Sequence, residues 1–266
     1  PKEIGRSCLT PLIGIRGGVA GDFTVTKLDD EHFFIVGSGM AERCHIRFFE
    51  MIERPNSVDF QSLTEEMCGF NVAGPKSREL LSRMTQDDLS TESWKFMRSR
   101  SITIAGIDAI AIRVSFTGDL GWEIYVKTEN QLKLYEALLD TGADLGVRPV
   151  GGRSLLSLRV EKGYGSWGRE YSPEYWPQEV GLERLIKLDK PDFLGKEAYL
   201  KIKDLEPREK LVVLEVTADQ DADPVGGEPV FLKDGTPVGR VTSGAYGYTC
   251  DKSLAICMIK TDYALP

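Results

Sequence analysis

The chain has 266 residues, of which 41% are hydrophobic and 28% are charged, a balance typical of folded globular proteins and not of disordered ones. Its 41 acidic residues outnumber its 33 lysines and arginines. The resulting net charge of −8 disfavours nucleic acid as a partner, because phosphate backbones are bound by basic side chains. No apolar run approaches the roughly 18 residues of a membrane-spanning helix, so we expect no membrane association.

The five cysteines are scattered, odd in number and without Cys-x-x-Cys spacing, so the sequence predicts no disulfide framework. This usage favours a reducing compartment and not a secreted protein. With only His32 and His45 as imidazole ligands, we expect no metal site. The sequence starts at Pro1 without a signal-peptide pattern, and we expect it to be a processed chain or part of a larger one.

The first third of the chain alternates short strand patterns with a glycine-rich turn. Residues 6–15 and 22–28 are predicted strands on either side of a turn at 16–21, and residues 32–37 predict a further strand. Helical spacing of apolar residues predicts a helix over 40–53.

The middle third follows a similar order. Residues 101–115 form a β-rich run, residues 122–126 predict a strand, and residues 130–139 predict a helix with one apolar side. Strand, turn, strand and helix thus follow one another in both 22–53 and 109–141. This recurrence predicts an α+β fold, with helices on one face of antiparallel sheets.

The last third begins with a predicted helix over 151–161 and a loop over 163–178 that is rich in aromatic residues. The charged stretch 202–209 is a predicted linker. From Lys210 onwards, short strand patterns separated by glycine turns predict a small sheet or barrel.

Glycine-rich nucleotide-binding loops are incomplete in this sequence. The nearest pattern, Gly37-Ser38-Gly39, lacks its third glycine. We therefore expect no flavin or nicotinamide site within this chain.

Two carboxylates have sequence surroundings that suggest chemistry. Asp22 and Thr24 are two residues apart on a predicted strand and share one face, although a solvated hairpin would also explain them. Glu123 lies between the apolar Trp122 and Ile124. It is either partly buried and paired, or turned outward by simple alternation.

Two further features suit a flat, anionic ligand. Arg153 beside glycines at a helix start can bind an anion, if it is not simply a surface arginine. The rings of the aromatic loop can stack a flat ligand or pack among themselves. They are Tyr164, Trp167, Tyr171, Tyr175 and Trp176.

Six segments spread over nearly the whole chain carry the most specific signal. They are GGVAGDFTV (17–25), GPKSRELL (74–81), SFTGDLGWEIY (115–125), GGRSLLSLRVEKGYGSWGRE (151–170), KPDFLGKEAY (190–199) and GRVTSGAYGYTCDKSLA (239–255). In this order they resemble the glycine-cleavage T-protein (aminomethyltransferase) family, in particular the folate-binding C-terminal portion of dimethylglycine and sarcosine dehydrogenases.

The resemblance implies an aminomethyltransferase-like α+β fold with ferredoxin-like lobes around an opening for tetrahydrofolate. It implies a folate-binding domain over 1–205 without its N-terminal part, and an incomplete small β-barrel domain over 206–266. The chain is therefore expected to be truncated at both ends of the fold.

The resemblance also implies an enzyme that transfers a one-carbon unit to tetrahydrofolate. In the flavin-containing members, a separate domain oxidises an N-methylated glycine such as dimethylglycine or sarcosine. The folate domain then captures the methylene unit as 5,10-methylenetetrahydrofolate. The expected cofactor of this chain is thus tetrahydrofolate, with FAD only in a separate flavoprotein domain or partner.

At the level of single residues, the resemblance implies that Glu123 binds the pterin ring and that Asp22 is the catalytic carboxylate. Thr24 falls near the reacting folate nitrogens and Arg153 near the folate tail. The predicted cofactor-binding set is Thr24, Phe116, Glu123, Arg153, Tyr164 and Trp167.

Two positions depart from the family pattern. Gly21 stands where transferases often carry a second aspartate, and Phe116 replaces a tyrosine and so cannot donate a hydroxyl. These departures leave open a non-catalytic, folate-binding regulatory relative. A demethylase that acts on another methylated compound, such as a sulfonium, is a further alternative.

Overall fold

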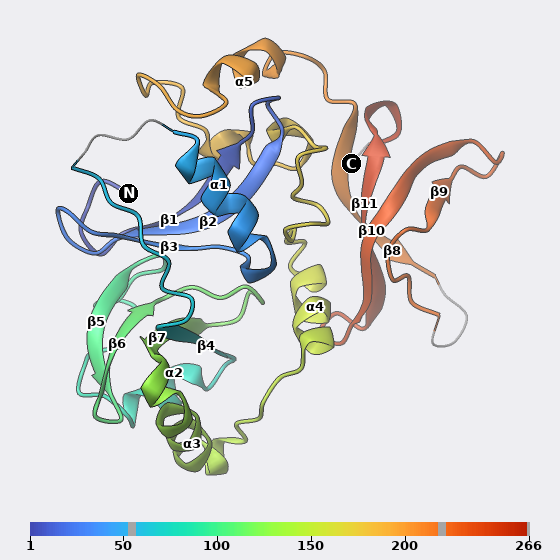
Figure 1. Ribbon diagram of the computed structural model, residues 1–266. Coiled ribbons are helices and arrows are strands. Elements are labelled where there is room, and N and C mark those ends of the chain that lie inside the picture. Colours follow the sequence, from blue (N-terminus) through green and yellow to red (C-terminus); the bar gives the residue numbers. More distant parts are fainter. Residues whose placement is uncertain (53–56, 218–221, 265–266) are drawn as a thin grey trace. The chain divides into compact units, whose positions relative to one another are not determined.

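The computed structural model describes residues 1–52, 57–217 and 222–264 (Figure 1). The chain divides into two compact units that alternate along the sequence. The first unit comprises Pro1–Cys8, Thr24–Gly39 and Glu53–Val150, and the second comprises Leu9–Phe23, Met40–Ile52 and Gly151–Pro266. None of the helices within the described ranges is both long and apolar enough to cross a membrane.

The N-terminal sheet has three strands in the order β1 (Ser7–Ile13), β2 (Val19–Lys27) and β3 (Phe33–Val36). The turn between β1 and β2 uses Gly17, whose φ of 86° suits glycine. β2 and β3 are antiparallel, with Thr24 opposite Val36 and Thr26 opposite Phe34. The helix predicted over 40–53 forms as α1 (Glu42–Glu50), and residue 53 lies outside the described residues.

The first unit contains a four-stranded antiparallel sheet in the order β4-β7-β6-β5. Its strands are β4 (Met67–Ala73), β5 (Ser99–Ile104), β6 (Ile107–Ile112) and β7 (Gly121–Lys127). The β-rich run predicted over 101–115 is thus two strands, because Ala105 and Gly106 form a turn with positive φ values. One face of the sheet carries the main core. That core includes side chains of α2 (Ser77–Ser82) and α3 (Gln131–Thr141).

The second unit contains α4 (Gly152–Glu161), α5 (Lys196–Ile202) and a C-terminal antiparallel sheet. Its strands are β8 (Glu209–Val216), β9 (Pro229–Phe231), β10 (Pro237–Gly247) and β11 (Lys252–Lys260), in the order β8-β11-β10-β9. β11 is buried along almost its whole length because apolar clusters cover both of its faces. Val160 of α4 packs in one of these clusters.

The element order agrees with the recurrence expected from the sequence. The antiparallel pair β2–β3 leads into α1, and the antiparallel pair β6–β7 leads into α3. The chain is therefore of the α+β class, with a sheet domain at its C-terminal end. The predicted division at residues 205 and 206 stays a prediction.

Candidate functional site

Glu123 lies on the face of β7 that is turned away from the core. Trp122 and Ile124 on either side of it are buried, so alternation directs Glu123, Tyr125 and Lys127 to the opposite face. The phenol of Tyr125 donates a hydrogen bond to Oε2 of Glu123 over 2.7 Å. Burial raises the pKa of the Glu123 carboxyl, and the hydrogen bond from Tyr125 opposes that increase.

The N-terminal sheet reaches this same face. The rings of Phe34 and Tyr125 meet edge to face, with centroids 5.0 Å apart. Phe34 is paired with Thr26, and Thr24 points to the same side of β2 as Thr26. Within the first unit, Thr24 therefore shares a sheet face with Phe34, and Glu123 shares one with Tyr125. The contact between the two rings joins these faces.

Asp22 precedes Thr24 by two residues on β2, so alternation gives the two side chains the same face of the strand. Burial raises the pKa of Asp22 to about 6, although a backbone hydrogen bond opposes the shift. No other side chain among the described residues hydrogen-bonds or pairs with this carboxylate. The phenol of Tyr171 lies within electrostatic reach, and burial together with the charge of Asp22 raises its pKa to about 12.

The opposite face of β2 is filled by an aromatic cluster. The His45 ring of α1 lies between Phe23 and Trp167, with centroid distances of 4.7 and 4.9 Å. His45 is only 3% exposed. A Cβ at Gly21 would approach Nε2 of His45 to 3.1 Å. Close packing against the imidazole therefore explains why a glycine, and not a residue with a side chain, occupies position 21.

This packing also gives Trp167 a structural role, because the ring contacts His45 and the core of the second unit. Its predicted contact with a ligand stays a prediction. Sequence reasoning did not single out His45. The sequence feature that could have indicated a buried His45 is its position within the apolar pattern that predicts the helix over 40–53.

The remaining predicted residues lie in distinct settings. Arg153 is exposed in the first turn of α4, and Phe116 is half-buried in the connection between β6 and β7. Tyr164 is half-buried, and Nζ of Lys162 lies 4.1 Å from the centre of its ring. Tyr125 was also missed in the sequence analysis. The available signal was its position two residues after Glu123 on a predicted strand, which places both side chains on the same face.

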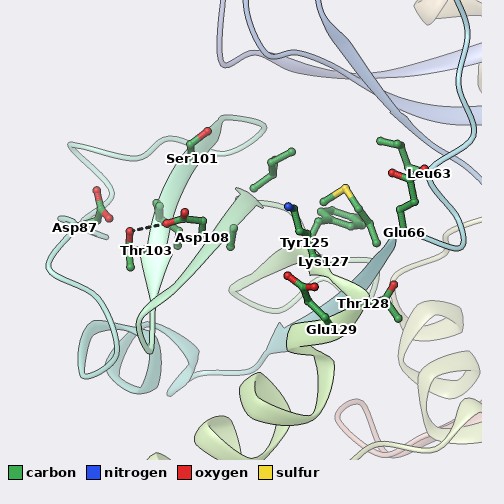
Figure 2. Close-up of a pocket in the computed structure, with 14 residues that line it drawn as sticks. Leu63, Glu66, Asp87, Ser101, Thr103, Asp108, Tyr125, Lys127, Thr128 and Glu129 are labelled. Atoms are coloured by element: carbon green, nitrogen blue, oxygen red, sulfur yellow. Dashed lines mark hydrogen bonds between the residues drawn. The ribbon is translucent and has the colours of Figure 1, made fainter.

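The first unit also has a cavity of about 830 Å³ over β5, β6 and β7 (Figure 2). Tyr125 lines it, together with side chains of mainly acidic or hydroxyl character. Thr103 and Asp108 in its wall are joined by a hydrogen bond of 3.2 Å. None of the seven residues predicted from the sequence lines the cavity, and its charged residues are Glu66, Asp87, Asp108, Lys127 and Glu129. This lining disfavours an anionic ligand.

Comparison with known proteins identifies two family domains in the chain. Residues 1–190 match the GCVT N-terminal domain, and residues 209–266 match the glycine cleavage T-protein C-terminal barrel domain. A solved structure of glycine cleavage system aminomethyltransferase T from Bartonella henselae has the same fold. Its TM-score is 0.84 at 24% identity, over 99% of this chain and 70% of that one.

Curated relatives fall into two groups. Dimethylglycine dehydrogenase from Mus musculus is 36% identical over 97% of this chain, and 4-methylaminobutanoate oxidase (formaldehyde-forming) from Paenarthrobacter nicotinovorans is 35% identical over 98%. This chain spans only 30% and 31% of their lengths. Aminomethyltransferase from Thermoanaerobacter pseudethanolicus is 31% identical over 96% of this chain and 68% of its own length. The chain therefore belongs to the glycine-cleavage T-protein (aminomethyltransferase) family, a family of enzymes, and is related to dimethylglycine dehydrogenase.

Proposed function

We propose that this chain binds tetrahydrofolate and loads it with a one-carbon unit from an N-methylated glycine of the dimethylglycine or sarcosine type. The product is 5,10-methylenetetrahydrofolate. The observation that carries the proposal is the half-buried carboxylate of Glu123, fixed by Tyr125 on the outer face of β7. The dehydrogenase relatives support the methylated-amine part of the proposal.

The geometry at Glu123 fits the pterin ring of tetrahydrofolate. That ring presents two adjacent donors, an N–H and an amino group, and a carboxylate provides matching acceptors. Tyr125 occupies one lone pair of Oε2, and no other hydrogen bond to Glu123 is made within the described ranges. Oε1 is therefore available to accept from a bound ligand.

Asp22 is the residue that we assign to proton transfer. Its pKa of about 6 lets the carboxyl hold or release a proton near neutral pH. When bound, tetrahydrofolate supplies the nitrogens that accept the one-carbon unit. Asp22 would take up the proton that is lost from the accepting amine, and the Thr24 hydroxyl would orient that amine.

The other predicted residues are assigned to binding. The exposed guanidinium of Arg153 would pair with the carboxylates of the folate tail. Phe116, Tyr164 and Trp167 would provide apolar and aromatic contacts to the ligand.

Oxidation of the methylated amine is assigned to a separate flavoprotein domain or subunit. This chain corresponds to about a third of the dehydrogenase relatives, and we propose that FAD belongs to the remainder. The bacterial cytoplasm or the mitochondrial matrix is the compartment that we propose, in keeping with the mitochondrial dehydrogenases.

Calorimetry with tetrahydrofolate tests the binding step directly. We expect a dissociation constant in the micromolar range or tighter, which corresponds to about −8 kcal/mol or better. Absence of binding at millimolar tetrahydrofolate would overturn the proposal.

The chemical step is tested by coupling the chain to a flavoprotein dehydrogenase with an N-methylated glycine as substrate. We expect Asp22→Ala to slow methylene capture by roughly 10²–10⁴-fold while the affinity for folate is nearly unchanged. Equal rates in the variant and the parent would remove Asp22 from the chemistry. Binding without capture in the parent itself would favour the regulatory alternative.

A further inference from the structure

Tyr125 and Glu123 form a unit on the outer face of β7. They are two residues apart on one strand, so both side chains project to the same side. The phenol donates to Oε2 over 2.7 Å, and the described residues offer Oε1 no donor. One carboxylate oxygen is thus held by the protein, while the other is left for a ligand.

The ring of Tyr125 is fixed by features outside β7. Gly69 lies directly opposite it on β4, and a Cβ at Gly69 would come within 2.8 Å of Cε1 of the tyrosine ring. The ring therefore lies over the glycine, in space that a side chain would otherwise fill. Phe34 contacts the ring edge to face at a centroid distance of 5.0 Å. Together Gly69 and Phe34 set the direction in which the phenol points.

Among the residues around Glu123, Tyr125 is the one whose hydrogen bond changes the pKa of its carboxyl. The residues paired with Glu123 are Asn71 on β4 and Ile112 on β6, and neither is charged. Phe34 of β3, which packs against Tyr125, is also uncharged. Burial raises the pKa of Glu123, and the hydrogen bond from Tyr125 is the opposing influence.

We propose that Tyr125 is a positioning residue, which fixes the carboxylate of Glu123 in one orientation and directs Oε1 toward the donor edge of the ligand. The inference rests on the proposed folate function and deepens it. A carboxylate held in this way accepts from a ligand edge with two N–H donors and repels an edge that presents an acceptor. The Gly69–Tyr125–Phe34 contacts therefore contribute to selection among flat heterocycles, although none of the three supplies a charge.

The first measurement requires no ligand. In protein labelled with ¹³C-glutamate, the Glu123 carboxyl signal is identified by its loss in Glu123→Gln and is then titrated in the parent and in Tyr125→Phe. We expect the titration to move to higher pH in Tyr125→Phe, because the donor that favours the ionised form is gone. Tyr135→Phe, on the exposed side of α3, is the matched control and should leave the titration unchanged.

The second measurement is anaerobic tetrahydrofolate binding between about pH 5.5 and 8. We expect Tyr125→Phe to weaken affinity about three- to tenfold at pH 7.5, the range for one lost hydrogen bond. As the pH is lowered, the affinity of Tyr125→Phe should also begin to fall at a higher pH than that of the parent, because Glu123 becomes protonated earlier. In the Glu123→Gln background, Tyr125→Phe should cause no further loss, because the group that it positions has been replaced.

The outcomes separate the two proposals. If the parent binds no tetrahydrofolate, the proposed function is overturned, and the Glu123 titration still decides whether Tyr125 controls the carboxylate. If the parent binds but Tyr125→Phe has the parent's pH profile and affinity, the positioning role is wrong. Gly69→Ala keeps the phenol but displaces its ring, so it should shift the pH profile in the same direction. An unchanged profile in both variants contradicts the inference.

Discussion

Arg159 and Glu170 form a fully buried ion pair, with Nη1 of the arginine 2.9 Å from Oε2 of the glutamate. The hydroxyls of Thr242 and Ser243 each donate to Oε1 over 2.6 Å. Burial alone raises the pKa of Glu170, but these hydrogen bonds and the charge of Arg159 bring it below its ordinary value. Asp22 is the opposite case, because burial raises its pKa to about 6 and no such donors surround it. Within the second unit, Glu170 is thus a buried carboxylate whose charge is stabilised, whereas the half-buried Asp22 has a raised pKa.

Replacing the glutamate of the buried pair is expected to be costly. We expect Glu170→Gln to lower the free energy of unfolding by about 3–5 kcal/mol, because it leaves Arg159 buried without a counter-charge. Urea denaturation at neutral pH measures this change. Glu197→Gln, in the exposed pair with Lys201, is the control and should lower the free energy of unfolding far less, because water screens that pair. Similar losses in both variants would show that burial of the pair is not the cause.

Asp22→Asn is expected to stabilise the protein at neutral pH. Because the pKa of Asp22 is raised in the folded state, its stabilising contribution is present below pH 3.8 and is lost as pH rises through about 6. At pH 7.5 the parent therefore carries the full penalty of a buried charge, which we estimate at about 1–3 kcal/mol. Thermal unfolding at pH 7.5 and pH 4 should show the gain mainly at the higher pH. Equal effects at both values would contradict the assignment of a raised pKa.

Glu123→Gln is expected to weaken tetrahydrofolate binding by at least about 2 kcal/mol, roughly thirtyfold. The amide keeps the shape of the side chain but presents an NH₂ group to the donor edge of the ligand. Asp119→Asn on the β6–β7 connection, where the carboxylate is exposed, should change affinity by less than about 0.5 kcal/mol. Calorimetry measures the tetrahydrofolate affinity of both variants. Similar affinities would show that Glu123 does not bind the pterin ring.

Gly18→Ala is expected to destabilise the second unit by about 2–3 kcal/mol. A Cβ at this position would lie 2.2 Å from the carbonyl oxygen of Pro173, so the backbone would have to move. Gly39→Ala serves as the comparison, because its Cβ meets nothing within 4 Å. That variant should be neutral or slightly stabilising. Circular-dichroism melting curves for the two variants test the difference, and equal melting temperatures would show that the close approach at Pro173 is relieved without cost.

Local periodicity determined much of the fold and part of the candidate site. Alternation around Glu123 placed it opposite the buried Trp122 and Ile124, and alternation along β2 gave Asp22 and Thr24 one face. These relationships depend only on the two-residue repeat of a strand, so they can be read from adjacent positions. The resemblance of six ordered motifs added the family, which the family-domain matches confirm.

Tertiary structure decided which distant residues meet these side chains. Phe34 and Gly69 fix the ring of Tyr125, His45 occupies the space beside Gly21, and Arg159 finds Glu170. Each contact joins residues from separate elements, and side-chain periodicity within an element contains no information about its neighbour. The shifted pKa values of Asp22 and Glu123 follow from the same packing, because desolvation depends on what covers a carboxylate and not on the residues beside it in the sequence.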